Sequence, residues 1–275
     1  MTPVTPLLAA ATLAVSTLAG TLGALLGIGG GVFLVPFLVL GLGLPFQEAA
    51  GVSLAAVIGT SSAVSAATAG RAVINLRLGM VLEVATAAGG LAGGITAQLL
   101  APSTLQLIFA GMAVGVAAIM ATRPDDVALP PTADPGPLGG RYVDTATGAT
   151  LTYRVDRLSV GLFASFLAGN LSTLLGIGGG IIKVPALVTW CGVPMRVAAA
   201  TSAFMIGVTA TSGAVIYWGN GDLSPALAAS AVIGTHLGST LGLRFSGRAR
   251  ARYLRRLLAA VLIVVAVLMI ARALA

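Results

Sequence analysis

Charge is what this 275-residue sequence has least of. Asp, Glu, Lys and Arg together make up only 8% of the chain, against roughly a quarter of a soluble globular domain. Hydrophobic residues make up 57%, and the mean hydropathy is +1.02. Several stretches of about 20 apolar residues are long enough to cross a bilayer core as helices. The shortage of charge therefore excludes a soluble fold and predicts an all-α polytopic membrane protein embedded in a lipid bilayer.

Cysteine and catalytic motifs are equally scarce. The single cysteine, Cys191, excludes an intrachain disulfide and provides no metal cluster. The sequence contains no HExxH or GxSxG motif and no Walker lysine after its glycines. Nothing in it therefore assembles a group of catalytic residues. We expect a protein that is not an enzyme and needs no cofactor.

Basic residues outnumber acidic ones by 15 to 8, which gives a net charge of +7 and a pI of about 10.8. They fall mostly between the apolar stretches. This placement is typical of loops that orient a membrane protein, so we expect no nucleic-acid partner. Because no basic region precedes the first apolar stretch, we interpret residues 4–26 as a retained helix and not as a cleaved signal peptide.

Glycine is abundant, with 37 residues, and one glycine-rich phrase occurs twice. Residues 27–36 read GIGGGVFLVP and residues 176–185 read GIGGGIIKVP, at an offset of 149 residues. Each glycine costs a helix about 1 kcal/mol relative to alanine, and a helix break in hydrocarbon leaves backbone groups without water. Ser53 has a match at the same offset in Ser202. The phrase predicts an internal duplication with a broken helix in each half.

Ten apolar segments form two sets on either side of one polar stretch. They are residues 4–26, 32–44, 50–69, 79–100, 104–122, 158–175, 181–192, 197–218, 223–244 and 254–273. Segments 79–100 and 223–244 are expected to correspond with a register slip of a few residues. The resulting division is a first transmembrane repeat at 1–122, a polar cytoplasmic linker at 123–157 with a small β-hairpin around Thr147-Gly148, and a second transmembrane repeat at 158–275.

The two shortest segments, 32–44 and 181–192, reach only about 18–20 Å, which is too short for a comfortable crossing. Each is either the second half of a bent span or the return limb of a re-entrant hairpin. In the hairpin arrangement all basic residues except Lys183 and Arg272 lie on one side, as the positive-inside bias requires. We therefore predict six full spans, two hairpins, inverted repeats and both termini outside.

The broken helices suggest a binding site for an anion. A helix that begins at Gly31 or Gly180 presents unpaired N–H groups and the positive end of its dipole. In inverted hairpins both ends lie near the membrane midplane, where glycines let the backbone approach a ligand. The competing interpretation is that the glycines only allow close helix packing. The residues predicted to bind the substrate are Gly27, Gly29, Gly30, Gly31, Gly176, Gly178, Gly179, Gly180, Lys183, Ser53, Ser202 and Asn170.

Lys183 lies three residues beyond Gly180, whereas its repeat mate is Leu34. A lysine within a membrane is costly, so it either complements the substrate's charge or extends to water from a helix end. Ser53 and Ser202 enter the site because they are duplicated hydroxyls, and Asn170 because it precedes the second glycine phrase. The sequence also leaves open whether Glu83 and His236 carry coupling protons or have structural roles.

The duplicated G-I-G-G-G-x(4)-P phrase, at 27–36 and 176–185, resembles the sulfite exporter TauE/SafE family of membrane permeases, and the similarity spans nearly the whole chain. The resemblance implies export or exchange of small anions, including sulfite and organosulfonates. We therefore expect a secondary transporter of the bacterial inner membrane that works by alternating access. The alternatives are a passive anion channel and a carrier of small carboxylates. Glycine-rich helix faces also leave a homodimer open.

Overall fold

A computed structural model describes residues 5–26, 29–68, 73–122, 134–143, 150–245 and 251–274, and helices dominate these residues. The first half contains α1 (Pro6–Leu26), α2 (Gly31–Pro36), a short π-helix η1 (Phe37–Gly41), α3 (Phe46–Thr68), α4 (Leu76–Leu99) and α5 (Pro102–Thr122). The second half contains α6 (Leu158–Leu175), α7 (Gly180–Thr189), α8 (Met195–Gly219), α9 (Pro225–Phe245) and α10 (Ala251–Leu274). The all-α polytopic fold class is therefore confirmed.

The ten predicted segments all coincide with helices, with ends that differ by a few residues. The segment 32–44 is divided in the structure, because α2 gives way to η1 directly after Pro36. Proline has no backbone N–H, so it cannot donate the regular bond of an α-helix to the residue four positions earlier. A wider π turn is one way in which a helix accommodates such a disruption.

Helix length alone does not identify the membrane crossings. Among the described residues, six helices are long and apolar enough to span a bilayer, namely α1, α3, α4, α6, α8 and α9. The sequence prediction also has six spans, but it assigns α1 and α6 to hairpins and counts α5 and α10 instead. Those two helices have 21 and 24 residues, so their length also allows a crossing.

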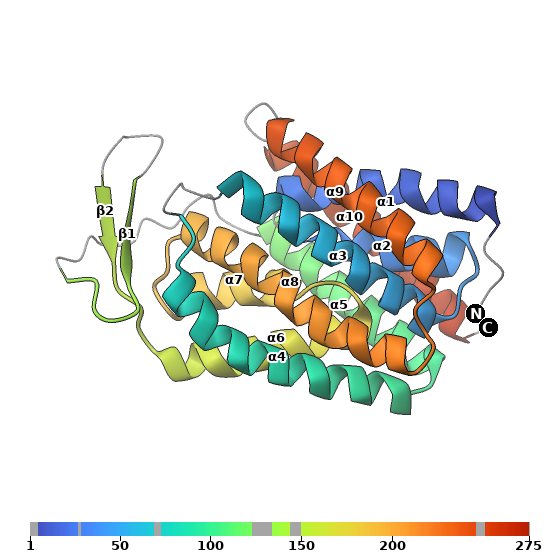
Figure 1. Ribbon diagram of the computed structural model, residues 1–275, viewed down its shortest axis with the longest axis horizontal. Coiled ribbons are helices and arrows are strands. Elements are labelled where there is room, and N and C mark those ends of the chain that lie inside the picture. Colours follow the sequence, from blue (N-terminus) through green and yellow to red (C-terminus); the bar gives the residue numbers. More distant parts are fainter. Residues whose placement is uncertain are drawn as a thin grey trace.

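The helix pair α6–α7 forms a hairpin. Cys191, just beyond α7, accepts a hydrogen bond of 3.0 Å at its carbonyl from the N–H of Asp156. Its Sγ lies 3.9 Å from the carbonyl oxygen of Arg157, the residue before α6. The chain therefore returns to the end at which α6 begins. Figure 1 shows α1 and α10 reaching one end of the molecule and the strands β1 and β2 at the other.

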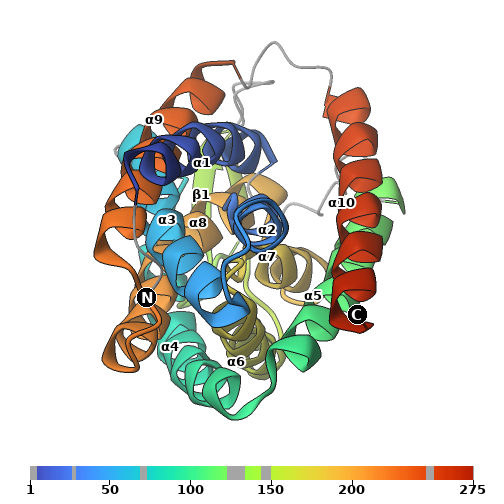
Figure 2. The ribbon, with the colours of Figure 1, turned by 90° about the vertical axis from the view of Figure 1, so that its right-hand side faces the viewer.

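Equivalent helices exchange partners between the halves. The helix α1 packs along α9, α6 packs along α4, α3 packs on α8, and α5 packs on α10. Seen along the helices, α2 and α7 lie in the middle of the molecule, and α5 and α10 stand together at one side (Figure 2). Such an exchange of partners is what a two-fold relation between the halves produces.

Helix-packing glycines keep the offset of 149 residues, so the expected register slip between α4 and α9 is wrong. A Cβ on Gly20 of α1 would lie 2.5 Å from the carbonyl oxygen of Thr235, and a Cβ on Gly169 of α6 would lie 2.1 Å from that of Thr86. Gly20 and Gly169 are 149 positions apart, and so are Thr86 and Thr235. Two further contacts follow the same rule, Gly89 with Phe166 and Gly238 with Thr17. Close backbone contacts at these glycines therefore keep the two halves aligned even where their side chains have diverged.

The two halves run in opposite directions where they meet. Near the start of α3, a Cβ on Gly51 would lie 3.2 Å from the side chain of Tyr217, near the end of α8. Toward the end of α3, Ser61 Oγ donates a 2.6 Å hydrogen bond to the carbonyl of Ala203, in the first half of α8. The helices α3 and α8 are therefore antiparallel, which supports an inverted relation between the halves.

The polar linker carries a small β-hairpin of strands β1 (Gly140–Val143) and β2 (Thr150–Tyr153), which pair antiparallel. The predicted turn at Thr147-Gly148 lies outside the described residues. Asn75 connects this hairpin to α4: its Nδ2 donates to the carbonyl of Leu138 at 2.7 Å and to the hydroxyl of Tyr153 at 2.8 Å. Burial raises the pKa of Tyr153, so its hydroxyl stays neutral.

Candidate functional site

The two glycine phrases form tight turns that only glycine adopts without strain. Gly29 and Gly30 have φ angles of 83° and 71°, and Gly176 and Gly178 have φ angles of 70° and 75°. A side chain at these positive φ values would clash with the backbone. Of the predicted site residues, Gly27 lies outside the described residues.

The two turns meet in the middle of the molecule. A Cβ on Gly31 would lie 2.6 Å from the carbonyl oxygen of Gly176 and 2.9 Å from Ser53 Oγ. Ser53 in turn donates a 2.5 Å hydrogen bond to the Gly176 carbonyl. This hydroxyl therefore ties α3 to the second turn. The beginning of α2 therefore lies against the backbone of the second half. The beginning of α7 lies instead beside the side chain of Lys183.

The beginning of α7 is accompanied by a buried cation. Gly179 precedes the helix without a side-chain cap, and its carbonyl accepts the N–H of Lys183 at 3.1 Å. The N–H groups of the first turn therefore lack acceptors within the helix. The Lys183 side chain folds back toward this end, because its Cε would lie 3.3 Å from a Cβ on Gly179. Lys183 is only 1% exposed, so it does not extend to water.

Lys183 faces Glu83 of α4 across the interior, close enough for their charges to interact. Thr209 of α8 donates a 2.8 Å hydrogen bond to Glu83 Oε1. Two atoms of the pair, Lys183 Nζ and Glu83 Oε2, are buried and have no hydrogen-bond partner among the described residues. The chain therefore holds a cation and an anion near each other without joining them directly.

Further unpaired hydroxyls lie on the neighbouring helices. Thr173 Oγ1 and Ser202 Oγ are buried without a hydrogen-bond partner in the described part of the chain. A Cβ on Gly90 of α4 would lie 3.1 Å from Thr173 Oγ1 and 3.5 Å from the methyl group of Thr209. Thr173 therefore lies on the same side of α4 as Thr209, the residue that donates a hydrogen bond to Glu83.

The contacts found for Asn170 and His236 lie outside this cluster. Asn170 is half-buried, and its backbone packs against Gly89 and Gly93 of α4. His236 is exposed, and its Nδ1 lies 3.2 Å from Ser62 Oγ. Glu83 was the polar residue whose partner sequence reasoning did not find, because the contact with Lys183 joins α4 to α7, 100 positions apart in the sequence.

The charged cluster occurs in one half alone. At the offset of 149 residues, Lys183 corresponds to Leu34, Glu83 to Val232, and Thr209 to Thr60. We call Glu83, Lys183 and Thr209 the charged triad. In the first half an apolar pair therefore replaces both charges, and Leu34 is fully buried.

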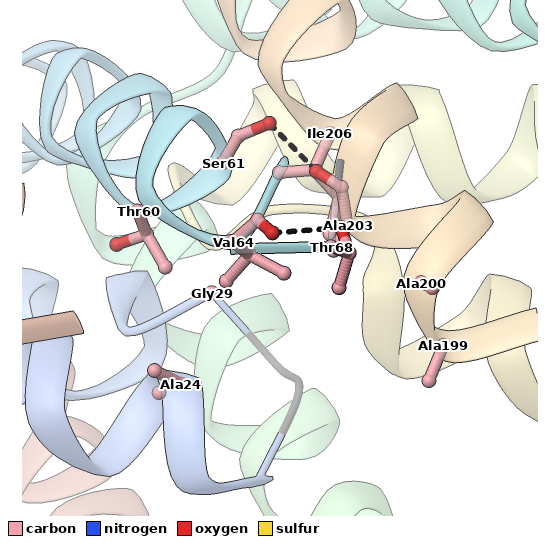
Figure 3. Close-up of a pocket in the computed structure, with 11 residues that line it drawn as sticks. Ala24, Gly29, Thr60, Ser61, Val64, Thr68, Ala199, Ala200, Ala203 and Ile206 are labelled. Atoms are coloured by element: carbon pink, nitrogen blue, oxygen red, sulfur yellow. Dashed lines mark hydrogen bonds between the residues drawn. The ribbon is translucent and has the colours of Figure 1, made fainter. Parts of the chain in front are cut away.

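A cavity of about 170 Å³ lies beside the first glycine turn (Figure 3). It reaches from Gly29 to Thr68, the last residue of α3, and it is bounded on the other side by the first half of α8. The lining residues are Gly23, Ala24, Gly29, Thr60, Ser61, Val64, Thr68, Ala199, Ala200, Ala203 and Ile206. Most are small or apolar, and Figure 3 shows the Ser61 hydroxyl turned to the carbonyl of Ala203.

The equivalent space in the second half is filled by an aromatic ring. Thr68 of the cavity corresponds to Tyr217, and Ala24 corresponds to Thr173. Tyr217 is fully buried, and its hydroxyl donates a 3.1 Å hydrogen bond to the carbonyl of Thr173. The cavity is thus present at the end of α3 beside the linker hairpin, and its counterpart is closed near the end of α8.

Comparisons with known proteins match almost the whole chain. The sequence model of the family described as Sulfite exporter TauE/SafE matches residues 12–269. A probable membrane transporter protein, YunE of Bacillus subtilis, is 27% identical over 255 residues, which are 90% of this chain and 92% of the relative. Sulfite exporter TauE/SafE family protein 6 of Arabidopsis thaliana is 36% identical over 104 residues, 38% of this chain and 24% of that protein. No solved structure matches the chain.

Proposed function

The chain belongs to the sulfite exporter TauE/SafE family and is a multi-pass membrane transporter, and we propose that it carries a small sulfur oxyanion, such as sulfite or an organosulfonate, by alternating access. Its family is one of transporters, which is not an enzyme class. A substrate of this kind is a compact anion with several oxygen acceptors, and the chemistry of the broken helix in the second half suits it.

One observation carries the proposal: Lys183, the only lysine of the sequence, is buried at the beginning of α7, and its ammonium group has no hydrogen-bond partner among the residues that the structure describes. The first-turn N–H groups and the helix dipole add positive potential at the same place. Ammonium and N–H donors together match the oxygens of an oxyanion, and Thr173 and Ser202 supply unpaired hydroxyls on neighbouring helices. An anion held there would lie against the second glycine turn, where Gly178, Gly179 and Gly180 have no side chains.

Alternating access is supported by the unequal packing of the two halves. Beside Gly29 the structure has a cavity that reaches the linker-hairpin end, whereas Tyr217 fills the equivalent space toward the opposite end. A carrier exposes its site to one side at a time by moving one repeat against the other. We assign this conformation to the state open at the hairpin end.

The arginines give the orientation that we propose. Arg77, Arg157 and Arg196 lie at the beginnings of α4, α6 and α8, and Arg244 lies at the end of α9. All four helix ends face the linker hairpin. The positive-inside bias then makes this the cytoplasmic end, in a bacterial inner membrane, with both termini outside. A homodimer stays a prediction, because single-chain geometry does not bear on it.

Transport by the purified protein in proteoliposomes tests the function. We expect saturable counterflow of labelled sulfite, thiosulfate or methanesulfonate, and a fall of about tenfold or more for Lys183→Met, because a charge-assisted contact contributes about 1.5–3 kcal/mol. Movement of small carboxylates without any sulfur anion would overturn the substrate class. Flux without counterflow would indicate a passive channel. Equal transport by wild type and Lys183→Met would remove Lys183 from the site.

A further inference from the structure

We propose that Glu83 is the proton-binding site of this carrier, and that the protein moves one proton together with each monovalent anion. The inference rests on the proposed anion site at Lys183. It begins from the charged triad, in which the carboxylate oxygen Glu83 Oε2 and the ammonium Lys183 Nζ are both buried and have no hydrogen-bond partner within the described part of the chain. Each of these atoms can therefore still accept or donate a hydrogen bond to a third group.

The charge of the buried site decides what happens when an anion arrives. In the empty site the Lys183 ammonium is balanced by the Glu83 carboxylate. An anion beside Lys183 brings a second negative charge into a region shielded from water, where an unbalanced charge is costly. If Glu83 takes up a proton at Oε2, the site again has one positive and one negative charge. The proton comes from water, no other bond is broken, and the loaded site carries the same net charge as the empty one.

No other ionisable group on the packed elements replaces Glu83 in this role. The sequence of α6 contains none, α7 contributes Lys183, and α8 contributes Arg196 in its first turn and Tyr217 in its last. On α4 itself the other charge is Arg77, in the first turn. Among the described residues, the charge that interacts with Glu83 is that of Lys183, and Thr209 is its hydroxyl partner.

The first half supplies an internal comparison. It has the hydroxyl Thr60 at the position of Thr209, but Leu34 and Val232 replace the two charges. The charges are therefore dispensable for packing a glycine turn against its neighbouring helices. Because Lys183 and Glu83 occur together in one half and are both missing from the other, they form a functional unit and not a requirement of the fold.

Methanesulfonate is the probe of choice, because a sulfonate stays ionised near neutral pH whereas sulfite itself exchanges protons there. Proteoliposomes would hold a pH-sensitive dye, and the membrane potential would be clamped at zero. For the wild type we expect proton uptake with methanesulfonate, and accumulation of up to about tenfold per unit of pH gradient, since one pH unit corresponds to a tenfold ratio. Glu83→Gln should lose this accumulation, and the methanesulfonate counterflow that it retains should not depend on pH, because glutamine resembles the protonated carboxyl group but cannot release its proton.

A second pair of variants guards against a folding defect. Thr209→Val removes the hydroxyl that stabilises the charged carboxylate, so the pH midpoint of transport should move upward. Thr211→Val, two positions along on α8, is the matched control, because Thr211 is exposed and donates only to the carbonyl of Gly207. Its midpoint should equal that of the wild type.

The outcomes separate the two proposals. Methanesulfonate counterflow without proton movement in the wild type would overturn proton coupling and leave the transporter assignment standing. Gradient-driven accumulation by Glu83→Gln equal to that of the wild type would overturn the role of Glu83, as would equal midpoints for Thr209→Val and Thr211→Val. Failure of the wild type to move methanesulfonate, sulfite or thiosulfate would instead overturn the proposed function.

Discussion

Single residues set the energetics of the site, and the charged triad shows how. When two opposite charges are buried near each other, their mutual attraction offsets part of the free-energy cost of removing them from water. The pair need not add to the stability of the fold, because apolar residues of similar size often serve as well. Leu34 and Val232 hold the equivalent positions of the first half. The pair is therefore retained at some cost, which is expected of a site that binds charge.

This argument predicts the stability of two variants. Lys183→Met leaves the half-buried Glu83 carboxylate without its counter-charge and should destabilise the protein by less than the cost of about 3–5 kcal/mol for a fully buried pair. The double variant Lys183→Met with Glu83→Gln removes both charges and should recover most of that loss. Thermal unfolding of the purified proteins in detergent would measure both. A double variant less stable than Lys183→Met would show that the pair is needed for packing.

At the scale of elements, Asn75 is one attachment of the linker hairpin to the membrane helices, beside the buried ring of Tyr153. This residue caps α4 by accepting the N–H of Leu78 at 3.0 Å, and it also donates to Leu138 and Tyr153 of the linker. One side chain thus starts a helix and holds the hairpin against it. The hairpin lies at the same end of the molecule as the last turn of α3, which lines the cavity.

Asn75→Ala should therefore have two effects. Loss of the cap should lower stability by about 0.5–2 kcal/mol. Loss of the two linker contacts should increase the rate at which added protease cleaves residues 134–157. Asn220→Ala is the matched control, because Asn220 is exposed and donates only to its own helix at Ile216. Equal cleavage rates for the two variants would show that other contacts hold the hairpin.

The helices themselves were predictable from the sequence, because apolar length, glycine and proline act locally. The positions of the breaks at Gly29 and Gly178 follow from the same local rules. The position-by-position correspondence of α4 with α9 was not predicted. Matched residues such as Glu83 and Val232 have different chemistry, and the correspondence is visible only in the backbone contacts at glycines. The partner of Lys183 was missed because the contact joins α4 to α7, which are far apart in the sequence. The sequence identified the cation, and the packing of distant helices supplied its carboxylate.

For the whole molecule, the unequal filling of two equivalent spaces is the main structural fact. Thr68 and Tyr217 stand at matching positions, and the exchange of a small side chain for a large one leaves a cavity at one end and closes the other. The rest of the fold preserves the offset of 149 residues through its helix contacts. For the proposed alternating-access carrier, this asymmetry predicts a preferred resting side, because closing the open end requires side chains that the first half does not supply.

Accessibility measurements on single-cysteine variants in a Cys191→Ala background test this asymmetry. Ala203→Cys lines the cavity and should react with a membrane-impermeant thiol reagent added at the hairpin end. Leu54→Cys, its equivalent at the offset of 149, is fully buried and should not react from either side. Replacing Tyr217 by Thr, the residue of the first half, should make Leu54→Cys reactive from the opposite end, because the hydroxyl contact to Thr173 and the ring volume are both lost. Protection of Leu54→Cys that persists in Tyr217→Thr would mean that the ring is not what closes this end, and the resting state would then have to be set by the movement of whole helices.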